Sequence, residues 1–133
     1  MTQKQKNIVM HRLDRARESL SAARILQDNR HYVGAVNRLY YACFYATTAL
    51  LETRGLASSK HSGVLSLFNR QFVKTGIIST KWGKFYGDLF DTRHEGDYAD
   101  FPKFASNEID ELHQAAASFV EELAQVIEKE IVE

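Results

Sequence analysis

Cysteine and proline are scarce in this sequence: Cys43 and Pro102 are the only residues of their kinds in the 133-residue chain. A single cysteine cannot form an internal disulfide, and it lacks the partners that a tetrahedral cysteine/histidine metal site requires. Because Cys43 stands between Ala42 and Phe44 in an apolar stretch, we expect it to pack in the core of a protein from a reducing cytoplasm.

Long apolar runs are also missing. No segment approaches the roughly 18 consecutive apolar residues of a membrane helix, and residues 1–7 lack the apolar core of a signal peptide. We therefore expect a cytoplasmic protein that does not contact a membrane. The chain has the common length of one domain, and no repeat or linker divides it, so residues 1–133 are predicted to form a single domain.

The familiar catalytic motifs do not occur. There is no phosphate-binding glycine loop, no GxSxG elbow, no HExxH and no paired cysteine/histidine spacing. Di-iron helical bundles use Glu-x-x-His pairs, and none of the five histidines has a glutamate three residues before it. These absences disfavour metal and nucleoside-triphosphate chemistry, and we expect neither a metal site nor a cofactor.

The net charge is zero, but the two halves of the chain differ in sign. Residues 1–76 contain 12 Lys/Arg and 4 Asp/Glu, whereas residues 77–133 contain 5 and 13. A basic half can form a face for polyanions. Alternatively, basic and acidic helices can lie side by side and neutralise each other, which is the interpretation we favour because surface pairing is common among helix charges.

Apolar residues recur every three or four positions and glycines fall mostly at segment edges, so helices are favoured over strands. Five helices are predicted. They cover residues 5–28, residues 32–54, a segment from 58 or 59 to about 75, a segment from 79 or 80 to an interruption at Gly96, and a segment from 106 or 107 almost to the C-terminus. Long helices joined by short loops predict an all-α, up-and-down antiparallel bundle of four to five helices.

Hydrogen-bonding side chains are embedded in these apolar helices, in three stretches of sequence. They are Asn37, Arg38, Tyr40, Tyr41 and Tyr45 in the second helix, His61 at the start of the third, and Arg93, His94, Asp97 and Tyr98 at the end of the fourth. The stretches read NRLYYACF at 37–44, followed by ALL at 49–51, KHSGV at 60–64 and RHEGDY at 93–98.

These stretches resemble the HEPN (higher eukaryote and prokaryote nucleotide-binding) superfamily. They are most similar to its small stand-alone branch, whose members are often paired with a minimal nucleotidyltransferase. The resemblance spans roughly residues 20–119 and agrees with the helices that periodicity predicts. It implies a homodimeric protein that binds RNA or nucleotide and partners a minimal nucleotidyltransferase in a toxin-antitoxin-like pair.

In the ribonuclease members, the resemblance implies an arginine, four to six further residues and a histidine just before the last long helix. Two copies of this motif meet across a homodimer interface. Residues 24–31 and 54–61 also have this spacing, but neither stretch precedes the last helix, so position selects Arg93. Five residues after Arg93, where the histidine is expected, this sequence has Tyr98.

That difference favours binding over catalysis. Metal-independent RNA cleavage needs a group with a near-neutral pKa to take the 2′-hydroxyl proton, and a phenol with a pKa of about 10 is a poor base. Arg93 can still clamp phosphate oxygens and Tyr98 can stack on a base. His94 is an alternative base if a turn near Gly96 brings it toward Arg93. The catalytic candidates are therefore Arg93, His94 and Tyr98.

The candidates for ligand binding are Asn37, Arg38, Tyr41, His61, Arg93, Asp97 and Tyr98. Each also has a structural interpretation. Arg93 and Asp97 are four residues apart and suit a surface ion pair. Arg38 suits a rim position, the tyrosines of the second helix suit the core or an interface, and His61 suits an exposed or capping position.

Three functions remain open. The first is binding of RNA or nucleotide, with metal-independent endoribonuclease activity as a variant in which Arg93 is essential. The second is a non-catalytic module that docks a nucleotidyltransferase, and the third is a purely structural homodimer. A homodimer is expected in all three, because a helix face rich in tyrosine and phenylalanine is typical of a contact surface.

Overall fold

The computed structural model describes residues 1–98 and 104–132, with side chains for residues 1–93 and 104–132. The elements are α1 (Gln3–Asp28), α2 (Tyr32–Glu52), α3 (His61–Phe68), a π-helical turn η1 (Asn69–Val73), α4 (Thr80–Tyr98) and α5 (Ser106–Val132). The described ranges contain helices and no strands, so the all-α prediction is confirmed.

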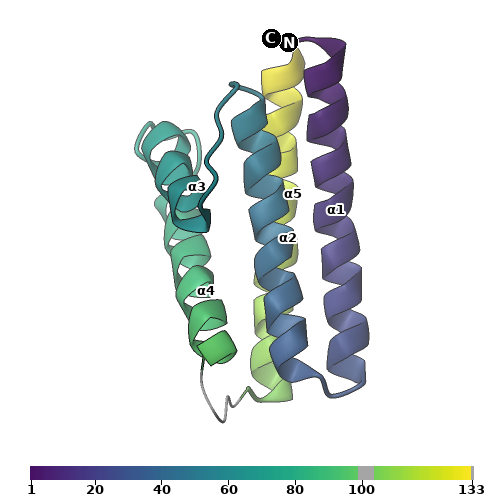
Figure 1. Ribbon diagram of the computed structural model, residues 1–133. Helices are drawn as coiled ribbons and strands as arrows, with labels where there is room; N and C mark the ends of the chain where they lie inside the picture. Colours follow the sequence, from purple (N-terminus) through teal and green to yellow (C-terminus); the bar gives the residue numbers. More distant parts are fainter. Residues whose placement is uncertain (99–103, 133) are drawn as a thin grey trace.

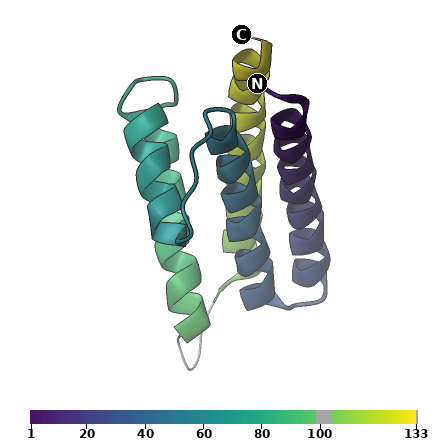
Figure 2. The ribbon, with the colours of Figure 1, turned by 45° about the horizontal axis from the view of Figure 1, so that its top comes forward.

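Helices α1, α2 and α5 stand side by side, and α3 and α4 lie against the opposite side of α2 (Figure 1; Figure 2). The long helices alternate in direction along the chain, as an up-and-down bundle requires. As a result, α1 begins and α5 ends at the same end of the molecule. Within the ranges described, no helix combines the length and the apolar character that a membrane span needs.

The short helix α3 departs from the simple alternation. The connection of residues 53–60 runs back along α2 before α3 begins, so that α3 starts beside the middle of α2 and not at its end (Figure 1). Gly55 has φ +67°, a conformation that glycine adopts without steric cost. This return of the chain places His61, the first residue of α3, against the aromatic residues of α2.

Several predicted boundaries are wrong by a few residues. Helix α1 starts at Gln3, two residues before the predicted start, because Thr2 and Gln5 form a capping box. In this box the Thr2 hydroxyl accepts a hydrogen bond of 3.1 Å from the Gln5 N–H. Ser58 and Ser59 do not begin the third helix, which starts at His61. Gly96 does not interrupt the fourth, because glycine costs only about 1 kcal/mol inside a helix.

The predicted third helix is an α-helix only as far as Phe68 and continues as the π-helical turn η1. Helix α4 packs closely on this turn at Gly83. A Cβ at that position would lie 2.8 Å from Asn69 Oδ1 and 3.2 Å from Val73 Cγ1. The glycine therefore permits the approach that joins the α3–η1 segment to α4, and with it the position of Arg93 farther along α4.

Aromatic side chains from α2, α3, α4 and α5 fill the centre of the bundle. The ring of Phe119 lies 5.6–5.8 Å from those of Tyr86, Phe68 and Trp82. Cys43 is fully buried, as predicted, and burial raises the pKa of its thiol. In α5, Ile109, Ala116, Phe119, Leu123 and Ile127 are buried and Leu112 is half-buried, so one apolar face of this helix packs on the core.

Candidate functional site

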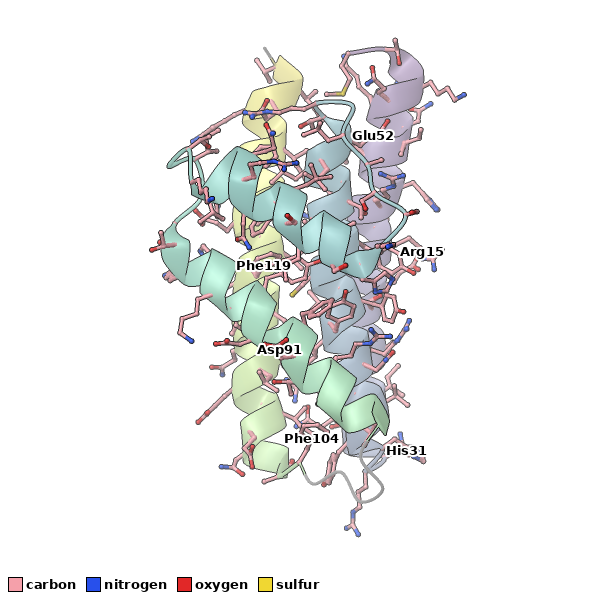
Figure 3. All side chains as sticks on the ribbon, turned by 60° about the vertical axis from the view of Figure 1, so that its left-hand side comes forward. Arg15, His31, Glu52, Asp91, Phe104 and Phe119 are labelled. Carbon is pink, nitrogen blue, oxygen red and sulfur yellow. The ribbon has the colours of Figure 1, made fainter. Side chains whose placement is uncertain are left out.

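The candidate site is centred on Arg93, near the end of α4. Its guanidinium carbon lies 4.9 Å from the centre of the Tyr40 ring and 5.5 Å from the centre of the Tyr41 ring. Both distances are within the range of cation–π contacts. In Figure 3, α3 and α4 lie in front of α2, and Asp91 marks the part of α4 just before Arg93. The site therefore joins α4 to α2.

His61 adds the first turn of α3 to the same cluster. Its ring centroid is 4.4 Å from that of Phe44, and it meets the Tyr41 ring edge-on at 5.7 Å. Nδ1 of His61 and the Tyr40 hydroxyl share a hydrogen bond of 3.1 Å. The hydrogen bond fixes the ring and leaves Nε2 as the nitrogen available to a ligand. His61 is thus a half-buried residue of the cluster as well as the first residue of α3.

His61 and Tyr40, which both interact with Arg93, favour their neutral forms at pH 7. Burial, and to a smaller extent the charge of Arg93, lowers the pKa of His61 below its ordinary 6.5. Burial raises the pKa of Tyr40 to about 12, although Arg93 acts in the opposite direction. The positive charge of Arg93 is therefore presented next to a neutral imidazole and a protonated phenol.

A second guanidinium approaches Tyr41 from its own helix. Arg38 lies 4.8 Å from the centre of the Tyr41 ring, and its Nη2 donates a hydrogen bond of 3.2 Å to Asn37 Oδ1. Asn37 and Arg38 are both half-buried, as a rim position requires. The structure thus brings Arg38, Tyr41, His61 and Arg93 together around one ring system.

The other predicted site residues lie where only the backbone is described. His94, Asp97 and Tyr98 belong to α4, and their side chains lie outside the described residues. The turn near Gly96 that would bring His94 toward Arg93 is absent from the backbone, because α4 continues to Tyr98. The catalytic roles of His94 and Tyr98 and the ion pair of Arg93 with Asp97 stay predictions.

Tyr40 and Phe44 are site residues that were not among the predicted ligand-binding residues. Tyr40 is fully buried, so its assignment to the core is confirmed, but it also holds His61 and lies under Arg93. Phe44 supplies the nearest ring to His61. Tyr40 and Phe44 are four residues apart and so share one face of α2, but their contacts with His61 depend on the return of the chain before α3.

Arginine side chains lie on two different faces of the molecule, and only one of these faces neutralises the acidic half of the sequence. Three arginines of the basic half pair with carboxylates of α5: Arg54 with Glu130 at 2.8 Å, Arg24 with Asp110 at 3.0 Å and Arg17 with Glu121 at 3.7 Å. Neutralisation between helices is therefore confirmed for these residues. Arg38 and Arg93 instead lie over tyrosine rings on the other side of α2.

Comparison with known proteins agrees with this architecture. The profile of the HEPN domain matches residues 9–129, so the chain belongs to the HEPN domain family. A UPF0332 protein of Thermotoga maritima is 43% identical over 128 residues, 96% of each chain. The protein named "Putative toxin MJ0605" of Methanocaldococcus jannaschii is 37% identical over 117 residues, which cover 88% of this chain and 86% of the relative.

Proposed function

We propose that this HEPN protein binds RNA, and that Arg38, Tyr41, His61 and Arg93 form its binding site. The observation that carries the proposal is the position of Arg93, whose guanidinium lies over the Tyr40 and Tyr41 rings next to His61. Arginine binds phosphate oxygens through two parallel hydrogen bonds. Bases of single-stranded RNA stack on aromatic rings and on guanidinium planes.

The arrangement provides a separate group for each part of a nucleotide. Arg93 and Arg38 offer positive charge to the phosphate, and Nε2 of His61 offers one more polar contact. The half-buried ring of Tyr41 offers a surface for the base. The Tyr40 hydroxyl holds His61 by a hydrogen bond, and the Phe44 ring packs against the imidazole. His61 is therefore fixed before RNA binds, which reduces the entropy lost on binding.

Metal-independent cleavage of RNA is a second candidate function, favoured by the neutral state of His61. The phenol of Tyr98 is a poor general base, so in this reaction the imidazole of His61 acts as the base. Its Nε2 takes the proton of a 2′-hydroxyl, the 2′-oxygen attacks the adjacent phosphorus, and the 5′-oxygen leaves with a proton from water. Arg93 stabilises the charge on the phosphoryl oxygens. The products carry a 2′,3′-cyclic phosphate and a 5′-hydroxyl.

A toxin-like role is part of the same proposal. The support is the similarity to two proteins of Methanocaldococcus jannaschii that are named as toxins, "Putative toxin MJ0605" and "Putative toxin MJ0142". The protein acts as a homodimer together with a minimal nucleotidyltransferase. Sedimentation at micromolar concentration and co-purification with a nucleotidyltransferase encoded next to it test these two points. A monomer, and a nucleotidyltransferase that elutes separately, would contradict them.

The test of RNA binding is fluorescence anisotropy with a labelled single-stranded oligoadenylate at several salt concentrations. Arg93→Ala is expected to raise Kd about tenfold or more, because hydrogen bonds to charged groups contribute roughly 1.5–3 kcal/mol. Arg17→Ala is the matched control, since it removes one surface charge on the α5 side of α1. Equal affinities of the two variants, or no binding by the wild type, would refute the proposal.

A further inference from the structure

A cavity of about 350 Å³ opens between α1, α2 and the connection of residues 53–60. Leu51, Leu56 and Val64 give it an apolar part. Figure 3 shows Arg15 close to the point where the connection from Glu52 reaches α3, and Arg15 lines the same cavity. The volume of the cavity is at the lower end of small-molecule sites, which span about 300–1,000 Å³. The cavity has room for about one nucleoside.

The opposite part of the cavity is basic. Arg15 Nη2 donates a hydrogen bond of 3.1 Å to the Tyr45 hydroxyl, and its guanidinium lies 5.0 Å from the centre of that ring. Arg12 Nη1 donates to the Thr48 carbonyl oxygen at 3.1 Å. Two arginines of α1 are therefore held against α2 at the rim of an apolar cavity, with His11 beside them. Such a combination suits a planar apolar group that carries an anion.

The cavity is continuous with the site around Arg93. Phe44 lines the cavity, and its ring is also the one 4.4 Å from His61. The rings of Tyr45 and Tyr41 are 6.0 Å apart on the same face of α2. Arg15 and Arg38 both line a shallower groove between α1 and α2. A continuous row of contacting arginine and aromatic side chains therefore leads from Arg93 to Arg15.

We propose that this cavity is a second nucleotide subsite, which takes the base of a nucleotide while Arg15 and His11 contact its phosphate. The inference rests on the proposed function, because the nucleotide belongs to the same single strand of RNA that Arg93 binds. The negative phosphate suits the rim, and the base suits the part formed by Leu51, Leu56 and Val64. Glu52 lies 3.7 Å from Arg12 and partly neutralises its charge. Arg15 therefore contributes more than Arg12 to the attraction of the phosphate.

Two variants test the cavity without disturbing the core. Ala57 is exposed and lines the cavity, so Ala57→Trp fills it from the outside. Arg15→Gln keeps hydrogen-bond donors near Tyr45 and removes the charge. We expect each variant to raise the Kd of the labelled oligoadenylate about tenfold, with unchanged thermal unfolding. Arg17→Ala is the control and keeps the wild-type Kd.

The outcomes separate this inference from the proposed function. If Arg93→Ala weakens binding and both cavity variants bind like wild type, the subsite is refuted and the proposed function stands. If the wild type binds no RNA, both are refuted. Adenosine monophosphate is titrated in parallel, with the methyl signals of Val64 and Leu56 as the readout. Shifts with the oligonucleotide alone support the RNA subsite, whereas equal shifts with the mononucleotide overturn it in favour of a free nucleotide.

Discussion

The Tyr40 hydroxyl and Nδ1 of His61 lie 3.1 Å apart and form the hydrogen bond that connects α2 to the start of α3. Tyr40 is fully buried and His61 is half-buried, so the bond leads from the core to the surface of the candidate site. Because Arg93 lies over the Tyr40 ring, one buried tyrosine orients both the imidazole and the guanidinium. The core and the site therefore depend on each other.

Tyr40→Phe removes the hydroxyl and keeps the ring. We expect the protein to lose about 1 kcal/mol of stability, the usual contribution of one intramolecular hydrogen bond. RNA affinity falls as well, but less than in Arg93→Ala, because the ring under Arg93 remains. Urea unfolding and anisotropy measure the two effects. Tyr32→Phe, at the start of α2, is the control, and equal behaviour of the two variants would contradict the role of the hydroxyl.

The low pKa of His61 predicts a dependence of stability on pH. The folded protein favours the neutral imidazole, because burial and then Arg93 lower this pKa below 6.5. The unfolded chain therefore takes up a proton first as the pH falls. The contribution is fully present above the unfolded pKa and is lost as the pH falls from there through the folded pKa.

His61→Gln isolates this contribution. Urea unfolding of the variant and the wild type between about pH 8 and about pH 5 measures it, since imidazole titrates in this interval. We expect the wild type to lose more stability than His61→Gln toward acid pH. A wild type whose stability follows the variant in parallel over the whole interval would show that His61 titrates normally.

Gly63 is predicted to be essential for the path of the connection into α3. A Cβ at this position would lie 2.0 Å from Ser58 Oγ and 2.9 Å from Ser58 Cβ, so the backbone of one of the two segments has to move. Gly63→Ala should therefore destabilise the protein and weaken RNA binding by displacing His61. The double variant Ser58→Gly/Gly63→Ala removes the obstruction and should recover much of the loss in urea unfolding.

Gly87 provides the control for Gly63. It is also helical, but a Cβ at its position would meet no atom within 4 Å among the described residues beyond its own helix backbone. Gly87→Ala is expected to stabilise the protein by roughly 0.5–1 kcal/mol, since alanine loses less backbone entropy on folding. A Gly63→Ala variant that gains stability by the same amount would contradict the close packing of Ser58.

The long helices were predictable because each buries one face, and burial leaves a spacing of three and four in the sequence. The start of α3 and the turn η1 were not predictable in this way. They depend on close approaches at Gly63 and Gly83, which involve Ser58 and Asn69 from other segments. Local capping rules favoured Ser58 as a helix start, but its hydroxyl accepts from the Lys60 N–H in front of the helix.

The site was predictable in part. The resemblance to HEPN proteins singled out Arg93, Tyr41 and His61, and the structure brings these three together. The roles of Tyr40 and Phe44 were not apparent, because an aromatic residue on an apolar helix face is normally core. Their contacts with His61 arise only when the connection of residues 53–60 returns along α2, and sequence spacing does not show that path.

The most direct test of the central claim is an NMR pH titration of the His61 ring, with and without a saturating single-stranded oligoadenylate. A phosphate bound at Arg93 lies close to the imidazole and favours its protonated form. We predict that RNA raises the pKa of His61 in the wild type and in Arg17→Ala, and leaves it unchanged in Arg93→Ala. A pKa of His61 that RNA does not alter in the wild type would contradict RNA binding at this site.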